Sequence, residues 1–249
     1  MTVRLPFVPK WIAAELGALL TLVGAATGLL IFSMIADEVV EGETHGFDEA
    51  ILLAFRVSGD PAEPIGPKWL EIMILDITSL GSAAVLGLVT LAAVVFLFMD
   101  GKRHSALFVL LAVASGTALS YLLKTGFDRP RPDLVAHLAN VHTLSFPSGH
   151  AMGSAITYLT IGAVIARTER KRLLKVYVLS LAVGLTLIVG LSRIYLGVHW
   201  PTDVLAGWAL GAAWAMLCWF IALWLQRHGE IETGTPTTEA PIGEPMPPA

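Results

Sequence analysis

The sequence predicts an all-α fold, a bundle of six membrane-spanning helices with a functional site at the outer-leaflet ends of the helices. Three observations lead to this prediction. Hydrophobic residues make up 55% of the 249 residues and charged residues only 14%, whereas a soluble domain carries about 25% charged residues. The apolar residues gather in runs long enough to cross about 30 Å of hydrocarbon. Ionisable residues outside these runs collect at one end of the expected bundle.

Six runs of mostly apolar residues are long enough to span a membrane. The first run is longer than the apolar core of a cleavable signal peptide, so we expect the mature protein to retain it. Glycines recur within the later runs, and small residues suit close packing of helices in lipid. The six runs are Trp11–Ile35, Ile77–Met99, Ser105–Leu123, His150–Ala166, Leu173–Leu191 and Val204–Leu225.

Net charge and cysteine content exclude other classes of protein. The chain has 16 Lys and Arg against 20 Asp and Glu, a net charge of -4, so it lacks the general basic field of a nucleic-acid-binding protein. Cys218 is the single cysteine, and no disulfide can form within the chain. The composition leaves the oligomeric state open.

The basic residues predict the orientation, because cytoplasmic connections are enriched in Lys and Arg. With the N-terminus (1–10) in the cytoplasm, ten of the 16 basic residues lie inside, and the connection 167–175 alone holds five. Six spans return the tail, 229–249, to the cytoplasm. This tail is rich in Pro, Thr, Glu and Gly, so we expect it to be disordered. The membrane domain therefore covers 11–228.

The first outer connection, 36–68, is acidic and contains a short amphipathic pattern. A helix near Asp48–Val57 would place four apolar side chains on one face, which suits a helix lying in the membrane interface. These side chains are Phe47, Ile51, Leu52 and Phe55.

Basic residues gather at the outer mouths of spans three, five and six, where few are expected, and two histidines, a serine and an aspartate lie at matching depth. Ionisable residues are costly near a membrane and are therefore candidates for function. Fixed Arg and Lys side chains suit a phosphoryl group, and histidine can act as nucleophile or acid. Snorkelling to lipid headgroups is the alternative for any single cation. The gathered residues are Lys124, Arg129, Arg131, Ser148, His150, Arg193, His199 and Asp203.

Two of the local patterns end one span and begin the next. In Lys124-x6-Arg131-Pro132 the prolines stop the helix and hold the chain extended, so Arg131 can turn back over the bundle. In Pro147-Ser148-Gly149-His150, Ser148 can cap the following helix, and Gly149 lets backbone N–H groups approach an anion. A simple turn and cap is the alternative interpretation of the second pattern.

The third pattern is Ser192-Arg193-x5-His199-x3-Asp203. Pro201 suits the first turn of the last helix. The Asp203 carboxylate can then accept the Nδ1–H of His199 and leave Nε2 nucleophilic, as the acid does for the histidine of a catalytic triad. The alternative is that Asp203 only stabilises the helix dipole.

These three patterns, in this order, resemble the signature of the type 2 phosphatidic acid phosphatase and vanadium haloperoxidase superfamily, in its integral membrane lipid phosphatase branch. They cover Lys124–Asp203, and the six-span layout extends the likeness to about Trp11–Leu225. The resemblance implies hydrolysis of a lipid phosphate or diphosphate of the undecaprenyl diphosphate, phosphatidylglycerol phosphate or phosphatidate class. It also implies a protein of a bacterial inner membrane whose active site faces the periplasm or the exterior.

The resemblance implies a role for each matched residue. His199 would attack phosphorus to form a phosphohistidine, Asp203 would orient it, and His150 would protonate the departing oxygen. No metal or other cofactor is implied, and the outer mouths lack a carboxylate cluster suited to Mg²⁺. Membrane lipids and the lipid phosphate are the expected partners, and nucleic acid is not. The residues implied to hold the phosphate are Lys124, Arg131, Ser148, Gly149 and Arg193.

Five further polar residues lie near the patterns. We interpret Arg129 as a substrate-recognition surface, and His137 and His142 as solvated loop residues. Asp128 and Asp133 flank Arg131, and we expect neither to act directly.

Other functions stay open at this point. The same site can pass the phosphoryl group to a second lipid instead of water, because the acceptor depends on what else enters the pocket. Relatives that oxidise halides with vanadate share the pocket, but they are soluble. A non-catalytic anion-binding membrane protein or a transporter is a further alternative. Transport would predict ionisable groups near the midplane or paired broken helices, and the sequence indicates neither. His150, His199 and Asp203 favour chemistry over binding alone.

Overall fold

The computed structural model describes residues 10–139, 141 and 143–227. The expectations for the tail 229–249 and for His142 therefore lie outside the described residues. The helices are α1 (Lys10–Glu41), α2 (His45–Ala54), α3 (Lys68–Ser79), α4 (Ala83–Met99), α5 (Arg103–Phe127), α6 (Gly149–Thr168), α7 (Arg172–Tyr195) and α8 (Pro201–Arg227).

Five helices, α1, α5, α6, α7 and α8, are each long and apolar enough to cross a membrane. The helices α3 and α4 make a sixth span if they are taken together, with a bend of 49° between them. The all-α prediction with six spans is confirmed in this form. The expectation of one continuous span over Ile77–Met99 is wrong, because the chain turns at 80–82 before Ser82 caps α4.

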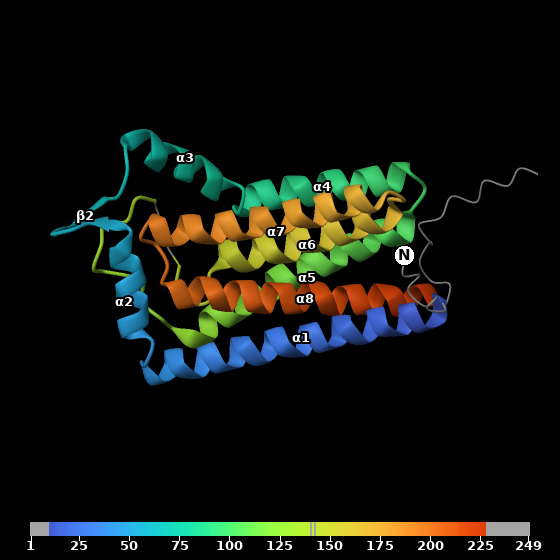
Figure 1. Cartoon of the computed structure of the whole chain (residues 1–249), viewed down its shortest axis with the longest axis horizontal. Coiled ribbons are helices and arrows are strands. Elements are labelled where there is room, and N and C mark those ends of the chain that lie inside the picture. Colours follow the sequence, from blue (N-terminus) through green and yellow to red (C-terminus); the bar gives the residue numbers. More distant parts are fainter. Residues whose placement is uncertain (1–9, 140, 142, 228–249) are drawn as a thin grey trace, which may run out of the picture.

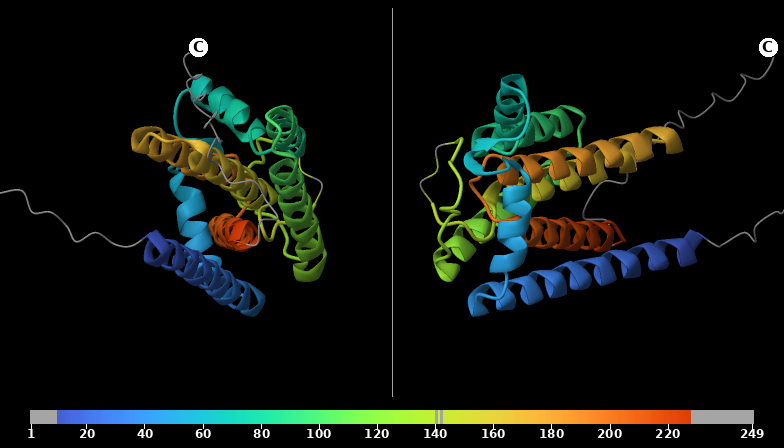
Figure 2. Two further views of the ribbon diagram at one scale, coloured as in Figure 1. Left: turned by 90° about the vertical axis from the view of Figure 1, so that its right-hand side faces the viewer. Right: turned by 60° about the vertical axis from the view of Figure 1, so that its left-hand side comes forward.

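In the end view of Figure 2, α8 lies between α1 and the helices α6 and α7. Its neighbours include α1 on one side and α6 on the other, and α6 packs in turn on α7. Glycine allows the close approach of α8 to α6, because a Cβ at Gly211 would lie 2.6 Å from the Cβ of Ala155. The helix α6 is the most buried of the five single-helix spans, and α1 is the least.

The helix α2 lies across one end of this bundle, beside a short hairpin of β1 (Arg56–Val57) and β2 (Asp60–Pro64) (Figure 1). We call this end the α2 end. The helices α5 and α7 finish there and α6 and α8 begin there. The sequence did not predict the hairpin, whose strands are only two and five residues long.

The expectation that α2 presents its apolar face to the membrane is wrong for three of the four residues, and of the four only Phe47 is exposed. Leu52 is fully buried and packs with Val135 and Val204, and Ile51 and Phe55 lie against the same cluster. The apolar surface that they cover comes from the chain after α5 and from the start of α8. The helix α2 is therefore a cover over the end of the bundle.

Candidate active site

The structure brings the eight predicted site residues together at the α2 end. The end of α5 and the extended chain after it supply two cations, and the start of α6 supplies three residues. The end of α7, the following connection and the first turn of α8 supply the others. In chain order they are Lys124, Arg131, Ser148, Gly149, His150, Arg193, His199 and Asp203.

His199 and Asp203 form the centre of this cluster. His199 lies in the connection before α8, not in the helix itself, and its Nδ1 is 3.3 Å from Oδ2 of Asp203. The same oxygen accepts hydrogen bonds from the Ser145 hydroxyl and from the Trp200 backbone N–H. Because an ionised carboxylate only accepts, Nδ1 is the donor and Nε2 keeps its lone pair. That lone pair faces Arg131, whose Nη1 lies 3.3 Å away.

Burial controls the charge of this histidine. The His199 side chain is 2% exposed. Desolvation lowers the pKa of His199 to about 3, although the hydrogen bond to Asp203 opposes this shift. The nearby charges of Arg131 and Arg193 also lower the pKa of His199. His199 is therefore neutral across the physiological pH range, as a nucleophile requires.

Backbone carbonyls hold two of the cations in place. The Lys124 ammonium donates to the carbonyl of Leu144 at 2.9 Å, and Nε of Arg131 donates to the carbonyl of Thr143 at 2.6 Å. Nη1 of Arg131 also donates to the carbonyl of Val198. Burial lowers the pKa of Arg131, while the charge of Asp203 opposes the shift. Carbonyls orient both cations without neutralising them, so the cluster keeps its positive charge.

Arg193 has an unfilled hydrogen-bonding capacity. The residue is 4% exposed, and Nη1 donates to the Thr78 hydroxyl at 2.9 Å. Within the part of the chain that the structure describes, its buried Nε has no hydrogen-bond partner. Burying an unpaired donor is costly, and an anion bound in the cluster would remove this cost.

The start of α6 adds the positive end of a helix to these cations. Ser148 caps the helix by accepting a hydrogen bond from the N–H of Ala151, and its own N–H donates to the Asp203 carbonyl at 3.0 Å. A Cβ at Gly149 would lie 3.3 Å from Cε of Lys124, so glycine lets the lysine pass close to the helix end. A helix N-terminus of this kind favours phosphate.

The sequence and the fold are similar to those of known phosphatases. Residues 105–227 match the PAP2 superfamily. Over 187 residues the chain is 32% identical to phosphatidylglycerophosphatase B of Bacillus subtilis, a match that covers 73% of this chain and 86% of that protein. This chain belongs to the PAP2 superfamily.

Two further similarities extend this result. The crystal structure of the transmembrane PAP2 type phosphatidylglycerolphosphate phosphatase from Bacillus subtilis superposes on this PAP2 protein with a TM-score of 0.70 and 30% identity. The superposition covers 80% of this chain and 95% of that one. A decaprenylphosphoryl-5-phosphoribose phosphatase of Mycobacterium tuberculosis is 41% identical over 98 residues, which are 38% of this chain and 49% of that protein.

The structure adds residues to the site of this PAP2 protein that the motifs did not include. Thr78, at the end of α3, accepts the hydrogen bond from Arg193. Gly81, in the bend before α4, brings the chain so close to His150 that a Cβ there would lie 3.1 Å from its Cδ2. The interruption of an apolar run by Thr78-Ser-Leu-Gly-Ser82 was the available signal for this bend. Ser145, which bonds Asp203, had no comparable signal.

The interpretation of Arg129 as a substrate-recognition surface is wrong. Its guanidinium forms ion pairs with Asp48 at 2.7 Å and with Asp203 at 2.6 Å, and its side chain is 10% exposed. The guanidinium therefore binds two buried carboxylates and does not face a substrate. His137 is a loop residue as expected, and its Nε2 lies 2.6 Å from the carbonyl of Pro132.

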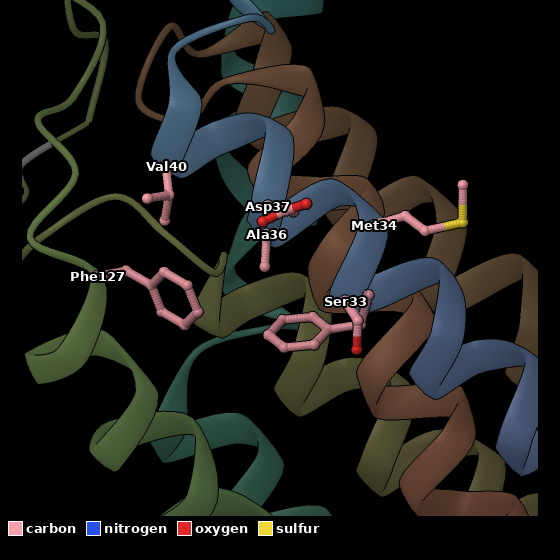
Figure 3. A pocket seen from close by; sticks show the side chains of 7 residues that line it. Ser33, Met34, Ala36, Asp37, Val40 and Phe127 are labelled. Carbon is pink, nitrogen blue, oxygen red and sulfur yellow. The ribbon is translucent and has the colours of Figure 1, made fainter.

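A groove of about 570 Å³ lies between α1 and the end of α5 (Figure 3). It contains none of the eight predicted site residues. The Phe127 ring on its wall lies 4.8 Å from the ring of Phe146, the residue after Ser145. The lining is mostly apolar and consists of Phe32, Ser33, Met34, Ala36, Asp37, Val40 and Phe127.

Proposed function

We propose that this PAP2 membrane lipid phosphatase hydrolyses a lipid phosphate or diphosphate through a phosphohistidine on Nε2 of His199. One observation carries the proposal: Nδ1 of His199 is bonded to the ionised Asp203 while Nε2 faces Arg131 in a cluster of three cations. Asp203 sets the tautomer, and the cations attract and orient the phosphoryl group.

The proposed reaction has two steps. Nε2 of His199 bonds to phosphorus as the bond from phosphorus to the lipid oxygen breaks, and protonated His150 gives its proton to that oxygen. Neutral His150 then takes a proton from water, the water oxygen bonds to phosphorus, and the P–N bond breaks to release phosphate. In both steps Lys124, Arg131 and Arg193 bind the equatorial oxygens, whose charge must be stabilised in phosphoryl transfer.

The similarity over most of the chain to a phosphatidylglycerophosphatase makes phosphatidylglycerol phosphate the first substrate to test. The groove between α1 and α5 supports a lipid substrate. Its apolar walls suit a hydrocarbon chain that stays at membrane depth while the phosphate enters the cluster.

We expect phosphate release to be independent of metal, because fixed cations neutralise the phosphoryl oxygens. The protein would be purified in detergent with excess EDTA and given phosphatidylglycerol phosphate, phosphatidate or undecaprenyl diphosphate. At least one lipid is expected to release inorganic phosphate at the same rate with EDTA as without it. Activity that disappears with EDTA and returns with a divalent cation would contradict the proposal. A new phosphorylated lipid in place of phosphate would show transfer to a lipid acceptor.

We also propose that the chain lies in a bacterial cell membrane with both termini in the cytoplasm and the α2 end outside. The basic connection 167–175, between α6 and α7, lies at the end of the bundle opposite the cluster, as the positive-inside rule requires for this orientation.

Cysteine labelling tests this orientation. In a Cys218→Ala background, Ser58→Cys in the hairpin turn is expected to react with a membrane-impermeant maleimide in intact cells. Lys171→Cys, the matched variant at the other end, is expected to react only after the membrane is permeabilised. The reverse pattern would place the α2 end in the cytoplasm.

A further inference from the structure

We propose that Asp48 and Arg129 position the Asp203 carboxylate, so that α2 forms part of the catalytic machinery. This inference rests on the proposed role of His199. Asp48 lies outside the residues matched to the PAP2 superfamily, 105–227, and none of the three sequence patterns includes it.

The arrangement is centred on the Arg129 guanidinium, which lies between two carboxylates. Nη1 is 2.6 Å from Oδ1 of Asp203, and Nη2 is 2.7 Å from Oδ2 of Asp48. Both carboxylates are fully buried. The guanidinium also lies 5.6 Å from the centre of the Trp200 ring. These contacts leave the arginine little freedom to turn toward a substrate.

Asp48 also holds the backbone next to Asp203. Its Oδ1 accepts a hydrogen bond from the Thr202 backbone N–H at 2.9 Å, and its Oδ2 accepts one from the Thr202 hydroxyl at 2.7 Å. Thr202 belongs to the first turn of α8, where a carboxylate is stabilised by unpaired N–H groups and the helix dipole. Asp48 therefore fixes both the arginine that binds Asp203 and the helical turn that carries it.

This network divides the two oxygens of Asp203 between two tasks. Oδ1 binds Arg129, and Oδ2 accepts from Ser145, Trp200 and His199. Rotation of the carboxylate would break the ion pair, so Oδ2 stays opposite Nδ1 of His199. Arg129 thus contributes orientation rather than direct contact with the phosphate.

The net charge of Asp48, Arg129 and Asp203 also stabilises the phosphohistidine. When Nε2 of His199 bonds to phosphorus and Nδ1 keeps its proton, the ring becomes positive. The group opposite that ring has one positive charge on Arg129 and two negative charges on Asp48 and Asp203, hence a net charge of one negative. Neutralising Asp48 would reduce this sum to zero and remove part of the stabilisation of the charged ring. The effect should fall on phosphohistidine formation and not on phosphate binding.

The test compares Asp48→Asn with the matched variant Asp128→Asn, which changes an exposed aspartate next to Arg129. On the best lipid substrate, Asp48→Asn is expected to lower kcat about 10- to 100-fold, as loss of a supporting partner does at other sites. The inhibition constant of inorganic phosphate and the KM are expected to stay close to those of the wild type. Asp128→Asn is expected to behave as the wild type.

A double-mutant cycle separates positioning from general damage. In an Asp203→Asn background, Asp48→Asn is expected to cause little further loss, because it acts through Asp203. Thr44→Val gives a milder change, since it removes only the hydroxyl that accepts from Nη2 of Arg129 at 2.9 Å. A partial loss of kcat with unchanged phosphate inhibition is expected there. Asp48→Glu and Arg129→Lys should retain more activity than Asp48→Asn and Arg129→Gln.

Wild-type kcat in Asp48→Asn would overturn the inference, and so would an equal loss with and without Asp203. Weaker inhibition by phosphate in parallel with the loss of kcat would also overturn it, because the pocket itself would then be distorted. His199→Ala tells the two proposals apart. If that variant is inactive while Asp48→Asn is normal, only the role of α2 fails. If His199→Ala is active, the proposed mechanism fails first.

Discussion

Replacing His199 with alanine is expected to lower phosphate release by a factor of about 10⁴ or more, because the variant has no nucleophile. The expected loss is specific to the position. His104→Ala changes an exposed histidine at the opposite end of the bundle and is expected to leave the rate unchanged. Turnover quenched in alkali should show phosphate bound to the wild-type protein and to His104→Ala, but not to His199→Ala. Full activity in His199→Ala would exclude this residue as the nucleophile.

The pH dependence gives a second measure of the same residue. A folded-state pKa of about 3 lies below the ordinary value of 6.5, so the His199 imidazole is neutral at every pH well above 3. We therefore expect no acid limb from His199 in kcat/KM between about pH 5 and 8. Asp203→Asn should lower kcat by about 10⁴, because an amide can stabilise the wrong tautomer of His199. An acid limb near pH 6.5 that persists in His150→Ala would contradict this assignment.

Replacing His150 with alanine is expected to have an effect that depends on the leaving group. Release from a lipid phosphate should fall about 10²- to 10⁴-fold, because the lipid oxygen then departs without a proton. The reaction with p-nitrophenyl phosphate should form the phosphohistidine at nearly the normal rate, since nitrophenolate departs without protonation. The second step would still lack its base, so the intermediate would accumulate.

A rapid-mixing experiment tests this expectation. His150→Ala should release a burst of about one nitrophenol per protein and then turn over slowly. The wild type should show no such slow phase, and His199→Ala should show no burst. The position of His150 supports the assignment, because it lies in the first turn of α6, next to Gly149 and Ser148 of the cluster. Equal losses on the lipid and on the nitrophenyl ester, with no burst, would exclude His150 as the acid.

Sequence alone predicted the features that depend on residues close together in the chain. The apolar runs located the ends of the long helices to within six residues, because crossing hydrocarbon requires about 20 apolar positions in a row. Short spacings predicted that His199 and Asp203 would bond, because one turn of chain separates them. Pro201 predicted the start of α8, and Ser148 predicted the cap of α6.

The tertiary structure decided the contacts between residues that are distant in the chain. Arg129 and Asp48 are 81 positions apart, Arg193 and Thr78 are 115 apart, and Ser145 and Asp203 are 58 apart. A repeating pattern in the sequence cannot predict such pairs, because they form only when packing brings two separate segments together. For the same reason the apolar face of α2 was assigned to the membrane: its pattern fits any apolar surface, and only the folded chain shows that the surface belongs to the protein itself.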